Sequence, residues 1–416
     1  MRVHVIGAGL SGLAAALALT EAGARVVLYD QAAQAGGRTR SFHEPALDRL
    51  IDNGNHLLLS GNHAALDYLS GIGAADRLIG PDSARFDFFE LDSGDRWTID
   101  LNRGPVPLWV LYSKRRVPGT SLADYVKGLK LLTAGDRTVA QLFARQGALY
   151  RRFWEPFAVA VLNTAPEDAA ARLLVPVIRE TLAKGAEASS PLIARRGLSD
   201  TFVDPALDAL ARRGVEIRLG CRIAGLEREA DRLTAIALTR GLERLAPGDA
   251  AVLAVPAWTA AELLPGLTVP DAFAPIVNVH FRIDGGRRPL LPAPLLGLVG
   301  GTAQWLFVRD DVVSVTISAA RALAERGASE IAAIVWPEVA QALELDVAKM
   351  PPVRVVKERR ATFLASAAQI ARRPGAATSL RNLMLAGDYT DTGLPATIEG
   401  AIRSGRAAAK LVLRAR

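Results

Sequence analysis

An acid, two amides and a histidine lie within residues 52–56 (Asp-Asn-Gly-Asn-His), directly before three leucines at 57–59. Imidazole has an ordinary pKa of about 6.5, so its protonated and neutral forms are both accessible near neutral pH. His56 is therefore a candidate proton donor, and Asp52 either orients it or is itself the acid if burial raises its pKa. A single histidine in a strand is more often structural, so packing and cofactor contact are the alternatives.

Three glycines near the N-terminus have the spacing of a phosphate-binding turn, Gly7-x-Gly9-x-x-Gly12. Gly7 permits a tight turn, Gly9 lets the backbone approach a pyrophosphate, and Gly12 lets a helix and a strand pack closely. The turn follows a short β-branched run and precedes an alanine- and leucine-rich stretch, residues 10–23, that predicts a helix. The sequence thus predicts a dinucleotide site, with a purely structural turn as the alternative.

The elements next to this turn supply further contacts. The predicted helix starts at Leu10 and Ser11, where free N–H groups and the positive end of the helix dipole meet phosphates. Asp30 ends the following strand-like run, a spacing that suits an acid bound to a ribose hydroxyl. An acid rather than an arginine at this position argues against a 2′-phosphate.

The composition is that of an ordinary globular protein, with 416 residues, 50% hydrophobic and 22% charged. This length predicts two domains or one interrupted domain. The single cysteine, Cys221, excludes an internal disulfide and fits a reducing cytoplasm. The net charge of +7 suits anionic lipid, nucleic acid or solubility, but no nucleic-acid-binding motif supports the second. No histidine or cysteine cluster has metal-ligand spacing, and no apolar run reaches the roughly 18 residues of a spanning helix.

The N-terminal unit resembles the superfamily of FAD-dependent amine oxidases and phytoene desaturases. There a Gly-Gly-Arg segment follows the first strand–helix–strand unit, as Gly36-Gly37-Arg38 does here. The two glycines permit close backbone approach and Arg38 can neutralise phosphate, although an exposed basic turn is the alternative. Residues 382–413 resemble the superfamily's closing motif, and residues 195–228 its strand near the adenosine. The resemblance implies an FAD cofactor.

The closing motif carries the contacts that the resemblance implies for the flavin. Asp388, which follows Gly387, would meet the ribityl–phosphate region, although the superfamily often has Glu there. The helix that starts at Pro395, Ala396 and Thr397 would face the isoalloxazine ring. Its N-terminus could stabilise negative charge on a reduced flavin.

The resemblance implies further contacts outside that motif. Ile223 would pack or hydrogen-bond through its backbone near the adenosine. The segment after the Gly-Gly-Arg motif runs beside the flavin ring in this superfamily, which would place Asn53, Gly54 and Asn55 at the cofactor. Within the closing motif, the position of Tyr389 one residue past Asp388 makes it a third catalytic candidate that would reach the substrate cavity.

Residues 52–56 and 297–307 resemble, more narrowly, the hydroxysqualene dehydroxylases of bacterial hopanoid synthesis. The resemblance implies that the allylic hydroxyl of hydroxysqualene is protonated and leaves as water, and that reduced FAD supplies a hydride to give squalene. NADPH or a separate reductase would be the electron donor. The alternatives are a carotenoid-type desaturase or a flavin amine oxidase and, in another class, a non-catalytic isoprenoid-binding carrier.

The predicted fold is α/β, a Rossmann-like FAD-binding domain with an inserted α+β substrate domain. We expect the FAD-binding domain to comprise residues 1–80, 190–268 and 376–416, and the substrate domain residues 81–189 and 269–375. Within the second insertion, strands are predicted at 274–284, 303–309 and 312–318, and a helix at 329–345.

Residues 104–130 combine an apolar and aromatic stretch with basic residues, namely Lys114, Arg115, Arg116, Lys127 and Lys130. Such a combination suits an anionic membrane interface. A substrate of the size of squalene must come from a bilayer, so we expect a cytoplasmic protein in peripheral contact with the inner face of the cytoplasmic membrane. A core helix with solvated lysines is the alternative.

Overall fold

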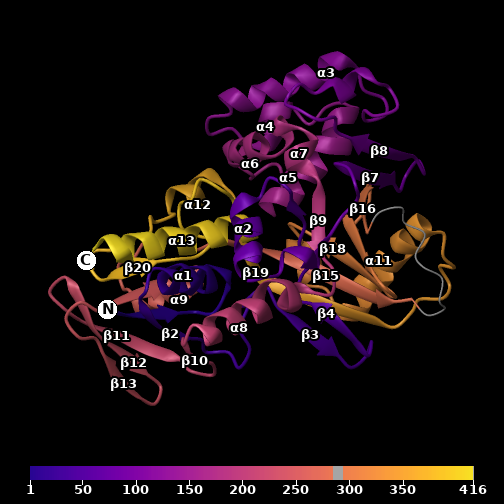
Figure 1. Ribbon diagram of the computed structural model, residues 1–416. Helices are drawn as coiled ribbons and strands as arrows, with labels where there is room; N and C mark the ends of the chain where they lie inside the picture. The colour runs from indigo at the N-terminus through magenta and orange to yellow at the C-terminus, as the bar shows by residue number, and fades with distance from the viewer. Residues whose placement is uncertain (284–293, 416) are drawn as a thin grey trace.

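The computed structural model describes residues 1–283 and 294–415, traced in Figure 1. One region is built on a five-stranded, fully parallel sheet in the order β10-β2-β1-β14-β20. Its strands are β1 (Arg2–Ile6), β2 (Arg25–Tyr29), β10 (Glu216–Arg218), β14 (Ala250–Leu253) and β20 (Leu383–Leu385). The order is that of a Rossmann-type sheet, and the predicted strand–helix–strand unit at the N-terminus is confirmed, with α1 at Leu10–Glu21.

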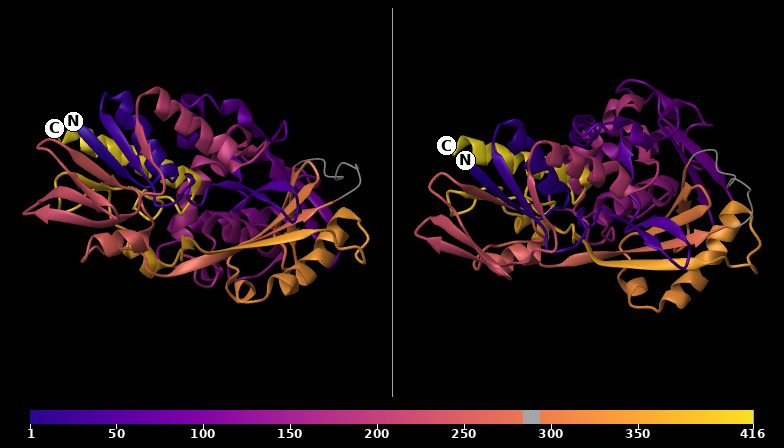
Figure 2. Two further views of the ribbon diagram at one scale, coloured as in Figure 1. Left: turned by 90° about the horizontal axis from the view of Figure 1, so that it is seen from below. Right: turned by 60° about the horizontal axis from the view of Figure 1, so that its bottom comes forward.

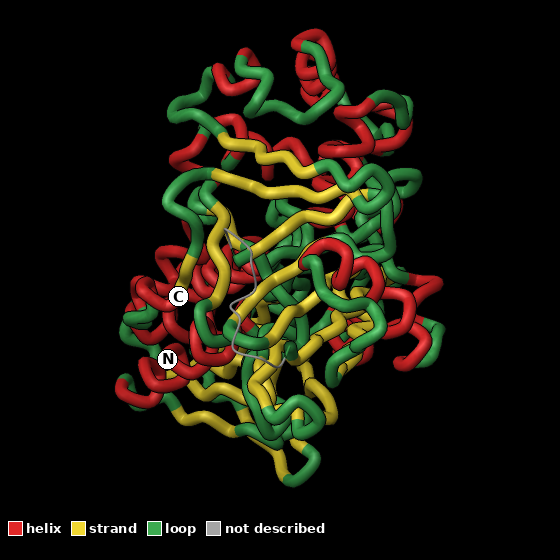
Figure 3. The backbone as a smooth tube through the Cα atoms, turned by 90° about the vertical axis from the view of Figure 1, so that its right-hand side faces the viewer, coloured by secondary structure: helices red, strands yellow, loops and turns green. Residues whose placement is uncertain are grey.

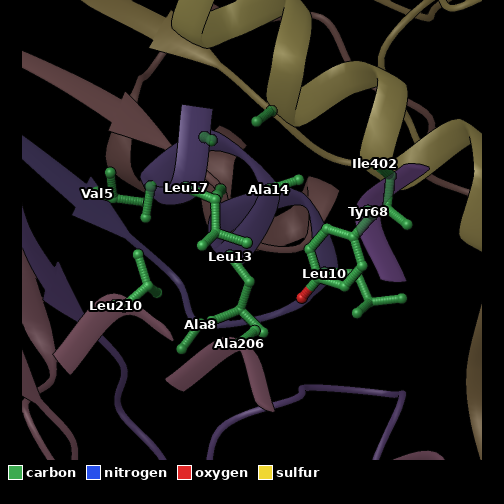
Figure 4. Close-up of a cluster of buried hydrophobic side chains, with 14 of the residues drawn as sticks. Val5, Ala8, Leu10, Leu13, Ala14, Leu17, Tyr68, Ala206, Leu210 and Ile402 are labelled. Atoms are coloured by element: carbon green, nitrogen blue, oxygen red, sulfur yellow. The ribbon is translucent and has the colours of Figure 1, made fainter. Parts of the chain in front are cut away.

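Helices cover one face of the parallel sheet. Alternate residues of β1, Val3 and Val5, pack on this side against the helices. The covering helices are α1, α2 (His63–Gly71), α8 (Asp204–Arg212) and α13 (Ile398–Arg414). Figure 4 shows Leu10, Leu13 and Leu17 of α1 among side chains from the neighbouring helices. Helices α1 and α13 cross closely, because a Cβ on Gly405 would lie 2.0 Å from the carbonyl oxygen of Ser11.

An antiparallel sheet and a helix cover the other face. The sheet contains β11 (Ile223–Glu229), β12 (Arg232–Leu238) and β13 (Gly241–Arg244), and the helix is α9 (Ala257–Leu263). Ile6 and Leu253 of the parallel sheet pack here with Ile236 of β12. The apolar cluster between these layers also holds Tyr389, which bears on the site below.

The second region is built on a seven-stranded mixed sheet in the order β19-β15-β18-β17-β16-β7-β8. Its strands are β7 (Arg85–Glu90), β8 (Arg96–Asp100), β15 (Phe273–Arg282), β16 (Leu295–Val299), β17 (Trp305–Arg309), β18 (Val312–Ile317) and β19 (Val353–Phe363). Helix α11 (Ala328–Leu343) packs on one face, where Val277, Val279 and Phe281 of β15 meet Val335 and Trp336. The three strands and the helix predicted in the second insertion are confirmed where the chain is described; Asp284, the last residue of the first predicted strand, lies outside it.

The long strands β15 and β19 connect the two regions. Phe273 pairs with Phe363 at the end that packs beside the parallel sheet, and Phe281 pairs with Val353 at the end under α11. Figure 2 shows this pair extending from one region into the other. The α/β fold with a parallel FAD-type sheet and a second α+β region is confirmed, while the expected domain limits stay a prediction.

Short helices and small sheets complete the molecule. The helices are α3 (Leu122–Val126), α4 (Val139–Phe143), α5 (Glu155–Leu162), α6 (Leu174–Glu180), α7 (Ala186–Ser189), α10 (Arg321–Ala324) and α12 (Ala367–Ala371). Figure 3 shows short helices gathered at the top of the view, above the strands. The small sheets are the hairpin β3 (Ser41–Glu44) and β4 (Arg49–Asp52), and the set β5 (Leu58–Leu59), β9 (Pro191–Ala194) and β6 (Leu78–Ile79). Within residues 1–283 and 294–415, no helix has the length and apolar character needed to cross a bilayer.

Candidate active site

The glycine-rich turn between β1 and α1 contains glycines with different roles. Gly7 has φ +110°, and a Cβ there would lie 2.2 Å from the carbonyl oxygen of Ala254. A Cβ on Gly12 would lie 1.8 Å from the carbonyl oxygen of Gly7. Gly9 differs, because a Cβ there would meet no protein atom within 4 Å. The open space beside Gly9, at the start of α1 where Leu10 and Ser11 lie, is where a pyrophosphate would fit.

The Gly36-Gly37-Arg38 segment lies against this turn. Gly9 and Gly36 form a parallel β-bridge, and the amide of Gly36 donates to the carbonyl of Ala8 at 2.8 Å. Gly37 has φ +58°, and a Cβ there would lie 3.5 Å from the Cα of Gly9. The two glycine segments, predicted separately, therefore border one space.

Asp30 lies at the end of β2, beside the same turn. Its Oδ2 accepts from the amide of Ala8 at 2.7 Å and its Oδ1 from the amide of Ala32 at 2.8 Å. Each carboxylate oxygen can accept a second bond, so Asp30 keeps capacity for a ribose hydroxyl. The amide of Cys221 donates to the carbonyl of Asp30 at 2.7 Å, and Ile223 begins β11 two residues later. Asp30 and the Ile223 segment thus lie side by side.

Arg38 meets Asp388, a residue from the opposite end of the chain. Its Nη2 lies 2.6 Å from Asp388 Oδ1. The turn that carries Asp388 is held from two sides: the amide of Gly387 donates to Ser404 Oγ of α13 at 2.9 Å, and the buried guanidinium of Arg373 donates to the carbonyl oxygens of residues 388–390. Two residues expected at phosphate and ribityl groups are thus a contacting pair.

The N-terminus of α13 begins directly after the expected Pro395-Ala396-Thr397 segment. Thr397 is the N-cap residue, and its Oγ1 accepts from the amide of Gly400 at 3.0 Å. This cap satisfies one of the free amides, while the dipole of a helix of this length stays directed at the segment before it. Together, the open space at Gly9, the Arg38–Asp388 pair and this helix start fit FAD.

Asp52 is a buried anchor at the end of β4. Its Oδ1 accepts from Ser41 Oγ at 2.6 Å and from the amide of Leu198 at 2.9 Å. Its Oδ2 pairs with Arg309 Nη2 of β17 at 2.7 Å, and the two side chains are 3% and 12% exposed. These partners join three separate stretches of chain. They give Asp52 a structural role that sequence reasoning did not consider, and its expected catalytic role stays a prediction.

His56 is half-buried, and the charges of Asp52 and Arg38 both act on its pKa. Burial lowers the pKa of His56 to about 4, with the positive charge of Arg38 acting in the same direction and Asp52 opposing both. The ring is therefore neutral at pH 7. It can donate one hydrogen bond and accept another, but it does not carry the second proton of an imidazolium. Its role as proton donor stays a prediction. Leu57 next to it packs with an apolar cluster that includes Phe86 and Phe153.

The amides between these two residues belong to a polar network. Asn55 Nδ2 donates to Thr316 Oγ1 at 3.0 Å, and that hydroxyl donates to Asn278 Oδ1 at 2.9 Å. Asn278 Nδ2 in turn donates to the carbonyl of Asn53 at 3.3 Å, and a Cβ on Gly54 would lie 3.4 Å from the same nitrogen. The network fixes the backbone of the 53–55 segment against the second sheet.

Sequence reasoning missed the residues on the facing sheet that hold this segment. Asn278 and His280 of β15 and Ser314 and Thr316 of β18 are all buried. They lie on the face opposite α11, and His280 Nδ1 and Ser314 Oγ are 2.8 Å apart. Polar residues at every second position within apolar strands were the available signal.

Tyr389 is buried in the apolar cluster between the parallel sheet and the β11–β13 sheet. Its ring lies against Gly387, where a Cβ would be 2.5 Å from the ring. Burial raises the pKa of the phenol above its usual range, and within the described chain its hydroxyl has no hydrogen-bond partner. The expected reach of Tyr389 into the substrate cavity stays a prediction.

Comparison with known proteins identifies the family of this chain. Residues 10–413 match the family model of flavin-containing amine oxidoreductases. The chain is 45% identical to a hydroxysqualene dehydroxylase of Sinorhizobium fredii and 46% identical to one of Rhodopseudomonas palustris, in both cases over 99% of this chain and 98% of the relative. A cyclohexylamine oxidase structure from Brevibacterium oxydans has the same fold, with a TM-score of 0.70 at 16% identity and 99% of each chain covered.

The family match spans nearly the whole chain, and the glycine turn, Arg38–Asp388 pair and α13 start provide the groups that an FAD site needs. The chain therefore belongs to the flavin-containing amine oxidoreductase family and, within it, to the hydroxysqualene dehydroxylases, which are FAD-dependent oxidoreductases.

Proposed function

We propose that the protein converts hydroxysqualene to squalene in bacterial hopanoid synthesis. The observation that carries this proposal is the full-length similarity to the two hydroxysqualene dehydroxylases. In the reaction the carbon–oxygen bond breaks, the hydroxyl takes a proton and leaves as water, and carbon gains a hydride. FAD, bound in its reduced form, would supply that hydride.

The protein's own residues would hold the cofactor and shape the site. The glycine turn, Asp30, Arg38 and Asp388 would bind the dinucleotide and ribityl groups, with Ile223 beside the adenosine. Asp52, through Arg309 and Ser41, fixes the segment that carries His56. The apolar cluster beside Leu57 would keep water from a developing cation.

The low pKa of His56 shapes the proposed proton transfer. A neutral imidazole can hydrogen-bond the substrate hydroxyl but has no extra proton to give at pH 7. We therefore propose that His56 binds the hydroxyl first, and that any proton it delivers is taken up after the substrate is in place. Tyr389 is the less favoured donor, because its ring is packed in an apolar cluster.

The electron donor and the location complete the proposal. Either NADPH acting directly or a separate reductase would reduce the FAD. Hydroxysqualene partitions into a bilayer, which supports peripheral contact with a membrane, and the single cysteine fits a place in the cytoplasm at the inner face of the cytoplasmic membrane.

Product analysis tests the function. The FAD-loaded protein is incubated with detergent-dispersed hydroxysqualene and NADPH, with and without a general flavin reductase, and products are read by mass spectrometry. We expect squalene, and the reductase arm identifies the donor. If no squalene forms in either arm while the oxidised protein dehydrogenates a polyene or an amine, the proposal is wrong.

A further inference from the structure

Exposed apolar side chains are concentrated in one part of the molecule. Of the thirteen large hydrophobic side chains that are exposed in the described chain, eight lie between residues 106 and 132. We call this set the docking face: Val106, Leu108, Leu111, Tyr112, Leu122, Val126, Leu129 and Leu132. Single exposed apolar residues need no explanation, but a contiguous set marks an interaction surface.

The geometry of residues 122–133 makes a continuous apolar stripe. Helix α3 runs into the 3₁₀ segment η3 (Lys127–Thr133), where residues three apart eclipse one another. Val126, Leu129 and Leu132 follow this spacing and are 63%, 63% and 75% exposed. Leu131 and Ala134 are buried in the protein instead. The segment is therefore apolar on its outer face as well as on its inner one.

A second short segment joins the same face. The 3₁₀ turn η2 (Leu108–Leu111) carries the exposed residues Leu108 and Leu111, with exposed Val106 and Tyr112 on either side of it. Trp109 of this turn makes an edge-to-face contact with Tyr125 of α3, with ring centroids 5.4 Å apart. In Figure 1, α3 lies at the top of the molecule, away from both chain termini.

Basic residues surround the docking face. Lys114, Arg115, Lys127 and Lys130 are exposed, and Arg116 is half-buried. Asp124 is the single acid between residues 104 and 133, and Lys127 neutralises it at 2.7 Å. This excess of positive charge is complementary to anionic lipid headgroups, each basic residue contributing about 1 kcal/mol near such a surface.

We propose that the docking face binds the surface of a bilayer that contains anionic lipid, with Leu129 and Leu132 inserted among the acyl chains and the lysines and arginines at the headgroups. Trp109 and Tyr125 pack against the same apolar cluster as Phe153 and Leu57, and Leu57 is the neighbour of His56. Resting on the proposed function, hydroxysqualene would leave the bilayer on the side of the molecule where this cluster lies.

Vesicle flotation tests the docking without any substrate. The FAD-loaded protein is floated with phosphatidylcholine vesicles that contain or lack phosphatidylglycerol, at low and high salt. We expect binding to the anionic vesicles that weakens with salt. The double variant Leu129→Ser with Leu132→Ser should bind about 10- to 100-fold more weakly. The matched control, Val347→Ser with Met350→Ser, changes two residues that are also exposed but lie outside the docking face, and should bind like the unmodified protein.

Two results would overturn the proposal. One is equal flotation of the unmodified protein and the docking-face variant at equal FAD content. The other is a dimer, seen by light scattering, that the variant abolishes, which would assign the face to a second copy of this chain. Squalene formation from detergent-dispersed substrate reports on the proposed function separately, so either idea can fail alone.

Discussion

At the scale of single residues, Gly9 is the glycine whose missing side chain leaves room for a ligand. Gly7 and Gly12 are required by the protein itself, since a Cβ on either would clash with a backbone carbonyl. The sequence motif predicts a different role for each of the three, with Gly9 at the pyrophosphate. The structure separates them and makes Gly9 the position at which substitution affects the cofactor with the least effect on the fold.

Gly9→Val should therefore lose FAD while remaining folded, because the added side chain fills the space beside the start of α1. The measurement is flavin absorbance per mole of purified protein, with circular dichroism to check folding. Gly71→Ala is the matched control, since a Cβ there also meets nothing within 4 Å but lies at the end of α2. Full FAD content in Gly9→Val would remove the assignment of this turn.

His56→Ala should keep FAD and lose turnover by on the order of 10²- to 10⁴-fold if the ring handles the proton. Because burial lowers the pKa of His56 to about 4, the ring stays neutral from pH 5 upward. The plot of kcat/KM against pH should then contain no step due to His56 near the ordinary histidine pKa of about 6.5. In that pH range the profiles of the unmodified protein and of His56→Gln should have the same shape. Turnover unchanged in His56→Ala would exclude the residue from the mechanism.

At the scale of elements, the pair Asp52–Arg309 ties the β3–β4 hairpin to β17 of the second sheet. Both side chains are removed from solvent, and Ser41 and Leu198 complete the carboxylate's hydrogen bonds. Removing one partner of a buried pair leaves the other charge without compensation, which costs more than the pair contributes.

Asp52→Asn should lower the free energy of unfolding by about 3–5 kcal/mol, because it leaves the Arg309 charge buried. Urea unfolding measures this. Arg326→Ala, which breaks the half-exposed pair with Glu330 on the first turn of α11, is the control and should cost no more than about 1 kcal/mol. If Asp52→Asn lowers the free energy of unfolding by no more than the control does, the Asp52–Arg309 pair does not stabilise the fold as proposed.

The sequence predicted the elements of the site better than the contacts between them. The glycine spacing and strand–helix–strand order located the FAD turn, because each signal lies within about 30 neighbouring residues. The partners of residues 52–56 could not be found this way. Alternation places Asn278 and Thr316 on one face of a strand, but which segment covers that face depends on pairing across more than 200 residues. For the same reason Arg309 gave no local sign that it would meet Asp52.

At the scale of the whole molecule, burial of neutral histidines makes stability depend on pH. His280 has no exposed surface, and burial lowers its pKa to about 3, helped by the charges of Arg309 and Arg354. In the unfolded chain His280 takes up a proton as the pH falls through about 6.5, whereas in the folded chain it stays neutral at that pH. The contribution of neutral His280 to the free energy of unfolding is thus complete above pH 6.5. It is lost as the pH falls toward the pKa of His280 in the folded chain.

The protein should lose about 2 kcal/mol of unfolding free energy between pH 6.5 and 5 through His280, from about 1.4 kcal/mol per pH unit. Urea midpoints at the two pH values measure this. His280→Gln should remove that part of the slope, whereas His43→Gln, which changes an exposed histidine, should keep it. Equal slopes in all three proteins would contradict the burial of a neutral His280.

The proposed function requires that hydroxysqualene gain a hydride, which bound, reduced FAD would supply. It is tested most directly by an anaerobic single turnover, in which the flavin is reduced, excess reductant is removed and hydroxysqualene is added. Squalene is then measured by mass spectrometry while flavin absorbance is followed. We predict one squalene per flavin re-oxidised, at matching rates. A flavin that stays reduced, with no squalene formed, would contradict the account.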